Sequence, residues 1–170
     1  MAEPGTLKRR WPRVERSEVI HAVRTTIAAV AALLLARLLK LPEFYWAPIT
    51  TIIVTQSTLG AALNISKQRL LGTALGAAMA ALLVTYAGGN AVVYGAGILL
   101  CGLICALLHV ERSAFRYAGI TLTIVMLVAH QQSPWIIAVH RFVEISLGIV
   151  VGLLISAVWP ERQTATIAGV

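Results

Sequence analysis

Long apolar blocks, separated by short polar or glycine-containing segments, run along this chain from about residue 18 to residue 159. The longest stretch without Asp, Glu, Lys or Arg is Leu70 to Val110, which has 41 residues. As a helix it would extend roughly 60 Å, twice the ~30 Å hydrocarbon thickness of a bilayer. Gly88-Gly89-Asn90 near its middle is where a helix can stop and reverse. The pattern therefore predicts an all-α membrane protein.

The apolar runs and the polar residues between them predict a bundle of six transmembrane helices. A basic arm at residues 1–17 precedes the membrane domain at 18–160, and a tail at 161–170 follows it. The predicted helices cover residues 18–40, 47–63, 68–87, 91–109, 113–130 and 136–159. The tryptophans at the ends of these runs are expected to mark the membrane boundaries, and they are Trp11, Trp46, Trp135 and Trp159.

Composition supports a membrane protein, because 58% hydrophobic and 12% charged residues leave too few charges to cover a soluble globule. The net charge of +7 does not predict nucleic-acid binding, since the basic residues form short clusters between apolar blocks. Ten of them fall on one side of the predicted bundle and three on the other, which predicts that both termini are cytoplasmic. The ten are Lys8, Arg9, Arg10, Arg13, Arg16, Lys67, Arg69, Arg112, Arg116 and Arg162, and the three are Arg37, Lys40 and Arg141.

The two halves of the chain resemble each other. Residues 47–54 match residues 118–125 at five of eight positions, at an offset of 71. Arg69-Leu70-Leu71 similarly resembles Arg141-Phe142-Val143 at an offset of 72. Because a unit of three helices crosses the membrane an odd number of times, the second unit is predicted to be inverted, as in many secondary transporters.

Polar side chains in the second and fifth predicted helices are candidates for a substrate path. Thr51, Thr55 and Thr58 share one helix face, with Gln56 to one side of it. In the fifth helix, Thr123 and His130 are seven residues apart and also share a face. The alternative is that these groups hydrogen-bond neighbouring helices and hold the bundle together.

Ionisable residues within the predicted helices are further candidates, because charges at membrane depth are costly. Arg24 and Arg37 could attract the carboxylate of an anionic substrate, and Glu144 could exchange a proton during transport. The alternatives are that Arg37 extends to the membrane surface and that His140 and Glu144 form an i, i+4 pair.

Small residues form helix-packing motifs in both halves, Gly72-x3-Gly76 and Gly148-x3-Gly152. They predict close contact either between the third and sixth helices or between two copies of the chain. Cys101 and Cys105 have no partner at zinc-ligand spacing, so no metal or cofactor is predicted. Neither His-Glu-x-x-His nor Gly-x-Ser-x-Gly occurs, so no enzyme is predicted.

Three segments and the end of the membrane domain carry a further signal, and they are residues 41–50, 54–61 and 68–73, followed by Arg141-Phe142-x-Glu144, Gly148 and Trp159-Pro160. They resemble the membrane transporter domain of the fusaric-acid-resistance-like family, which belongs with the aromatic acid exporters. The resemblance implies a six-helix unit in the inner (plasma) membrane that exports aromatic or other small organic acids, coupled to the proton gradient. Many relatives have Pro where this chain has Ser57, and larger relatives carry a cytoplasmic domain that this sequence lacks, which favours a homo-oligomer.

The leading hypothesis is therefore a transporter whose partners are the lipid bilayer, a small organic anion and protons. The alternative is a non-transporting scaffold or accessory subunit that assembles through its glycine-rich helix faces. A scaffold would need none of the ionisable groups inside the membrane, so substitution of Gln56 or Arg24 would separate the two hypotheses.

Overall fold

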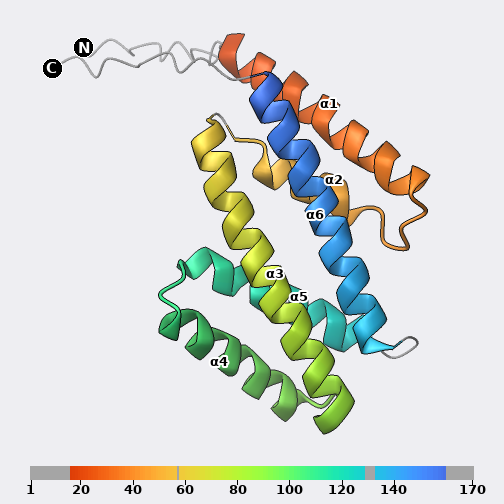
Figure 1. Ribbon diagram of the computed structural model, residues 1–170, viewed down its shortest axis with the longest axis vertical. Helices are drawn as coiled ribbons and strands as arrows, with labels where there is room; N and C mark the ends of the chain where they lie inside the picture. The colour runs from red at the N-terminus through yellow and green to blue at the C-terminus, as the bar shows by residue number, and fades with distance from the viewer. Residues whose placement is uncertain (1–15, 57, 129–132, 160–170) are drawn as a thin grey trace, which may run out of the picture.

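The structure is a computed structural model that describes residues 16–56, 58–128 and 133–159. Trp11, Ser57 and His130 therefore lie outside the described residues. Within the described ranges there are six helices and no strand, which confirms the predicted all-α class (Figure 1). The helices are α1 Arg16–Leu38, α2 Trp46–Val54, α3 Leu59–Ala87, α4 Ala91–Leu107, α5 Arg112–Val128 and α6 Pro134–Val158.

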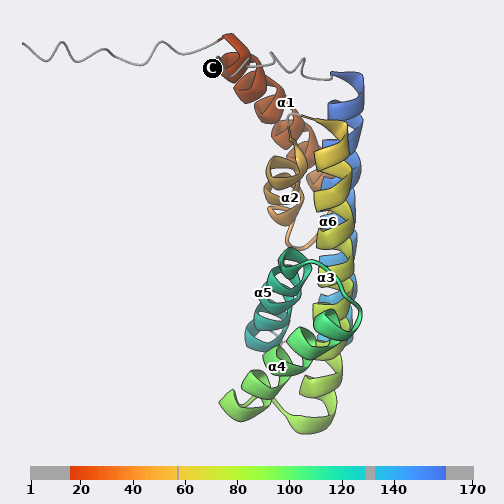
Figure 2. The same ribbon diagram turned by 90° about the vertical axis from the view of Figure 1, so that its left-hand side faces the viewer.

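Helices α3 and α6 form the long axis of the molecule. They have 29 and 25 residues, about 43 and 37 Å at the usual rise per residue. They lie side by side and run in opposite directions, with α1 and α2 towards one end and α4 and α5 towards the other (Figure 1). Figure 2 shows these four helices on one side of the α3–α6 pair.

Each short helix packs on the long helix of the other half of the chain. Helix α2 packs on α6 and α1, and α5 packs on α3 and α4. The outermost helices also reach the long pair, since α1 contacts α6 and α4 contacts α3. Many outward-facing side chains on these helices are apolar, among them Leu34, Leu99 and Leu154, which suits contact with lipid.

Three helices, α1, α3 and α6, are long and apolar enough to cross a membrane, and α4 is a shorter apolar helix. Helix α2 has nine residues and α5 has 17, which correspond to about 13 and 25 Å. Both are shorter than a ~30 Å hydrocarbon core. The prediction of six separate crossings therefore stays a prediction.

The predicted boundary between the second and third helices is wrong. Helix α2 ends at Val54 and α3 begins at Leu59, because Thr55 is extended and the Thr58 hydroxyl caps α3 by accepting a hydrogen bond from the Ala61 N–H at 3.2 Å. Residues 64–67, which the sequence places between helices, lie inside α3. Polar side chains are accommodated in this part of α3 because Asn64, and Gln68 directly after this stretch, hydrogen-bond to Glu111.

Four glycines bring the short helices onto the long ones. A Cβ added at Gly76 would lie 2.2 Å from the Ala118 carbonyl oxygen of α5, and one at Gly148 would lie 2.4 Å from the Ala47 carbonyl oxygen of α2. Gly72 meets the Ala114 carbonyl oxygen of α5 in the same way, at 2.3 Å, whereas a Cβ at Gly152 would meet the Val54 side chain of α2 at 3.0 Å. These contacts join α3 to α5 and α6 to α2, so they are neither the contact between the third and sixth helices nor the contact between copies that the sequence predicts.

Substitution of these glycines tests the close approach. We expect Gly76→Ala and Gly148→Ala each to lower the free energy of unfolding by about 1–3 kcal/mol, because the added methyl group meets backbone atoms that cannot move aside. Gly95→Ala is the matched control, since nothing lies within 4 Å of a Cβ at that position in α4. Unfolding in mixed detergent micelles measures the difference, and equal stability of the Gly76→Ala and Gly95→Ala variants would contradict this account of the packing.

Candidate functional site

Two buried arginines line one pocket between the long and the short helices. Arg69 comes from α3 and Arg141 from α6, and their exposed fractions are 5% and 2%. The pocket is lined by Trp46, Arg69, Thr73, Tyr117, Ile120, Thr121, Ile124, Arg141 and Ile145. Because a buried guanidinium needs compensating partners, what surrounds each arginine decides what the pocket can bind.

Arg69 has polar and aromatic partners but no acidic one among the residues that the structure describes. Its Nε donates a hydrogen bond to the Thr50 hydroxyl oxygen at 3.2 Å, and its guanidinium carbon lies 5.0 Å from the centre of the Tyr117 ring. Among the described residues Arg69 forms no ion pair. Its positive charge is therefore not neutralised by a carboxylate in the part of the chain that the structure covers.

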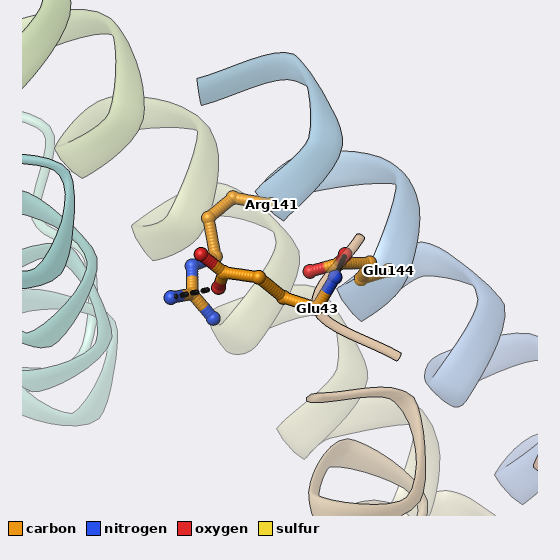
Figure 3. A network of polar contacts seen from close by, with 3 residues as sticks. All are labelled: Glu43, Arg141 and Glu144. Atoms are coloured by element: carbon orange, nitrogen blue, oxygen red, sulfur yellow. Dashed lines mark hydrogen bonds and ion pairs between the residues drawn. The ribbon is translucent and has the colours of Figure 1, made fainter. Parts of the chain in front are cut away.

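Arg141 has a carboxylate partner and an aromatic partner. Its Nη2 lies 2.6 Å from Glu43 Oε2 (Figure 3). Its guanidinium carbon lies 4.0 Å from the centre of the Trp46 ring. Its Nε and Nη1, and the Trp46 indole nitrogen, are buried with no hydrogen-bond partner among the described residues. This side of the pocket therefore carries spare hydrogen-bond donors.

Glu144 holds the residue that pairs with Arg141. It is fully buried on α6, and its Oε1 accepts a hydrogen bond from the Glu43 backbone N–H at 2.9 Å (Figure 3). The described chain contains no ion pair between Glu144 and Arg141. Glu144 thus fixes the backbone of the connection before α2, and Glu43 directs its carboxylate to the arginine.

The chemistry of the pocket suits a small anion. A guanidinium binds a carboxylate through two parallel hydrogen bonds, and the aromatic rings and isoleucines offer surfaces for an apolar body. The cavity volume is about 10 Å³, close to the space that one water molecule needs. The described arrangement therefore has no room for an organic acid, and binding one requires the helices to move apart.

Threonines of the predicted substrate path serve helix contacts in this arrangement. The buried Thr51 hydroxyl lies 2.9 Å from the Gly148 carbonyl oxygen, to which it donates, and 3.0 Å from that of Ala47. The buried Thr55 hydroxyl donates to the Thr51 carbonyl. Thr58 caps α3. None of the three lines the pocket of Arg69 and Arg141.

The other predicted site residues are spread over the molecule. The Gln56 amide donates to the Ile53 carbonyl, and Thr123 donates to Gly119 and lies 3.0 Å from the Tyr94 hydroxyl oxygen. Arg37 is exposed and lies over the Phe44 ring. Of the predicted residues, Glu144 is the one that the structure brings next to the pocket, through Glu43, and His130 lies outside the described residues.

Arg24 is buried and binds backbone carbonyls. Its Nη1 donates to Trp159 at 2.9 Å and its Nη2 to Gln56 at 2.6 Å, and His21 Nδ1 lies 3.4 Å from Nη2. These bonds join α1 to the end of α6 and to the segment after α2. Arg24 therefore connects three parts of the chain.

Sequence reasoning did not include Arg69 or Arg141 among the substrate-path residues. It placed Arg69 on the cytoplasmic side and Arg141 on the outer side, but both line one pocket. These two arginines therefore cannot be counted as basic residues on opposite sides of the membrane. Arg69 lies ten residues into α3, about 15 Å from its start, because this helix begins earlier than predicted. The repeat could have indicated that these two arginines belong to one site, because it aligns them with each other.

Comparison with known proteins gives a family and relatives. The sequence pattern of the family described as Fusaric acid resistance protein-like matches residues 29–155. The chain is 30% identical over 167 residues to Uncharacterized transporter YdhK of Escherichia coli, covering 92% of this chain and 25% of that protein. The protein of that name from Salmonella typhimurium is 28% identical, with 92% and 24% covered. The chain thus spans a quarter of these relatives. No solved structure matches it significantly.

The match and the apolar helices together identify a multi-pass membrane protein. The side of the membrane on which each terminus lies stays a prediction.

The role of Arg24 can be tested by its effect on stability. We expect Arg24→Met to lower the free energy of unfolding by about 1.5–3 kcal/mol, because two carbonyl oxygens lose a charged donor. Arg37→Met is the control, since the exposed Arg37 stacks on one ring and should cost about 1 kcal/mol or less. Unfolding in mixed micelles compares the two variants, and equal losses would argue against a connecting role for Arg24.

Proposed function

The chain belongs to the fusaric acid resistance protein-like family, and from this membership we propose that it exports aromatic or other small organic acids by alternating access. The observation that carries the proposal is the pocket lined by Arg69 and Arg141, in which Arg69 has no acidic partner among the described residues. The curated relatives are named transporters, which supports transport rather than catalysis.

The partners of the two arginines favour an aromatic acid. Trp46 and Tyr117 already lie against the guanidinium groups, and such rings also stack on a planar substrate. Thr73 and Thr121 offer hydroxyl groups at the same pocket. A carboxylate would bind Arg69 while the ring of the acid packs on the aromatic and isoleucine side chains.

Alternating access would come from two inverted units, residues 16–87 and residues 91–158. What supports this part of the proposal is a set of reciprocal contacts. Arg69 of the first unit lies on Tyr117 of the second, and Arg141 of the second lies on Trp46 of the first. Gly76 and Gly148 meet the residues that follow these two aromatic residues, again across the units. Inverted units that exchange partners in this way are suited to rocking about a central site.

Proton coupling is the last part of the proposal. Glu43 and Glu144 are the carboxyl groups beside Arg141. Arg69 on α3 and Tyr117 on α5 line the same pocket as Arg141, and Tyr45 directly precedes α2. A proton that binds either carboxyl group changes the charge beside the anion site. Proton-driven export would use this change of charge to alter the affinity of the site for the anion.

The scaffold alternative has less support. It rested on glycine-rich faces that would be free to bind another chain, but Gly72, Gly76, Gly148 and Gly152 face helices of the same chain. A scaffold would also have no use for a buried, unneutralised arginine, which is costly to fold.

Flux of benzoate into proteoliposomes containing the purified chain tests the proposal. We expect saturable flux that responds to a pH gradient, and an affinity about tenfold to a hundredfold lower in Arg69→Gln, because a charged hydrogen bond contributes about 1.5–3 kcal/mol. Arg112→Gln is the control, because Arg112 is also a helical arginine but is exposed at the start of α5.

The outcomes separate the hypotheses. If Arg69→Gln and Arg112→Gln lowered the affinity for benzoate equally, overall charge would explain the effect, and the proposed site would be contradicted. No saturable flux from folded, inserted protein with a panel of aromatic acids would support the scaffold alternative.

A further inference from the structure

The two halves of the chain differ at the positions beside their arginines. The offset of 71 that aligns Trp46 with Tyr117 places Glu43 opposite Ala114. The offset of 72 that aligns Arg69 with Arg141 places Glu144 opposite Gly72. Both carboxylates are therefore on the Arg141 side, and the Arg69 side has an alanine and a glycine.

The four residues also occupy equivalent contacts. Glu144 accepts a hydrogen bond from the backbone of Glu43, and a Cβ at Gly72 would lie 2.3 Å from the Ala114 carbonyl oxygen. The same two aligned positions thus meet twice across the two halves, once with a carboxylate at both positions and once with none. The consequence is electrostatic, since Arg141 has a carboxylate at 2.6 Å and Arg69 has none among the described residues.

We propose that Glu43 sets the charge of the acid that the site accepts: it occupies Arg141 as a substrate carboxylate would, so that the site binds a monocarboxylate on Arg69 and excludes a dicarboxylate. This rests on the proposed function and adds the class of substrate. Glu43 is suited to the role because its side chain is 23% exposed and lies on a connection rather than in a helix, while Arg141 is held on α6.

The physical basis is repulsion between like charges in a poorly screened site. The first carboxylate of an acid meets Arg69, which has no carboxylate partner among the described residues. A second carboxylate meets an arginine that is already neutralised and, next to it, the negative charge of Glu43. Juxtaposed like charges away from water cost several kcal/mol in recognition, and each ~1.4 kcal/mol is tenfold in affinity. The site would therefore select monocarboxylates by repelling dicarboxylates.

Benzoate and terephthalate are suitable probes, because they share one ring and carry one or two carboxylates. Equilibrium dialysis of the purified chain in detergent, at a pH where both acids are ionised, gives the two affinities. We expect the wild type to bind benzoate at least about tenfold more tightly than terephthalate. Glu43→Gln keeps the shape of the side chain and should raise the affinity for terephthalate by about tenfold, with little change for benzoate.

Two further variants make the test specific. Glu43→Gln combined with Arg141→Gln should return the preference for benzoate to the wild-type value, because the second free guanidinium is gone. Glu18→Gln, which removes an exposed carboxylate from the first turn of α1, should leave both affinities unchanged.

The outcomes distinguish this inference from the function on which it rests. Binding that depends on Arg69 but shows no change of preference in Glu43→Gln would overturn the role of Glu43 and leave the transport proposal standing. Absence of binding of either acid to the folded wild type would contradict the anion site itself. Wild-type protein that binds terephthalate as tightly as benzoate would overturn the inference without any variant.

Discussion

A guanidinium group that is buried among apolar helices must be given partners, and this molecule has to accommodate two of them around one pocket. Arg69 and Arg141 each lie against an aromatic ring, and the ring comes in each case from the short helix of the other half. Attraction between a cation and an aromatic face strengthens when water is excluded, so the pairing compensates part of the desolvation cost. The positions of α2 and α5 are tied to this requirement.

The spacing along the long helices explains how these rings are placed. Arg69 and Gly76 are seven residues apart, as are Arg141 and Gly148, so each arginine has a glycine two turns away on the same face. Each glycine meets the residue that directly follows the aromatic partner, Ala118 after Tyr117 and Ala47 after Trp46. Close packing at the glycine therefore fixes the distance at which the ring meets the guanidinium.

These relations also show what the sequence could and could not provide. Hydrophobic runs predict the helices well because they reflect the solvent around the chain. They do not predict that one helix ends at Val54 and the next begins at Leu59, where Thr58 caps the second helix. Trp46 illustrates the same limit, since its place at the end of an apolar run predicts a boundary, whereas its indole nitrogen is buried. Recognising Arg69 and Arg141 as residues of one pocket required both the repeat and the helix contacts, because burial arises from packing between segments distant in sequence.

Helix α2 has a particular place in this arrangement because it touches both arginines. Trp46 lies on Arg141, and Thr50, one turn further along the same face, accepts the hydrogen bond of Arg69. Glu43 lies three residues before the start of this helix, and Thr51 holds the helix to α6 through the Gly148 carbonyl. A shift of these nine residues along α6 would change the stacking, the ion pair and the hydrogen bond together. Opening the pocket and exposing both positive charges would then be a single movement.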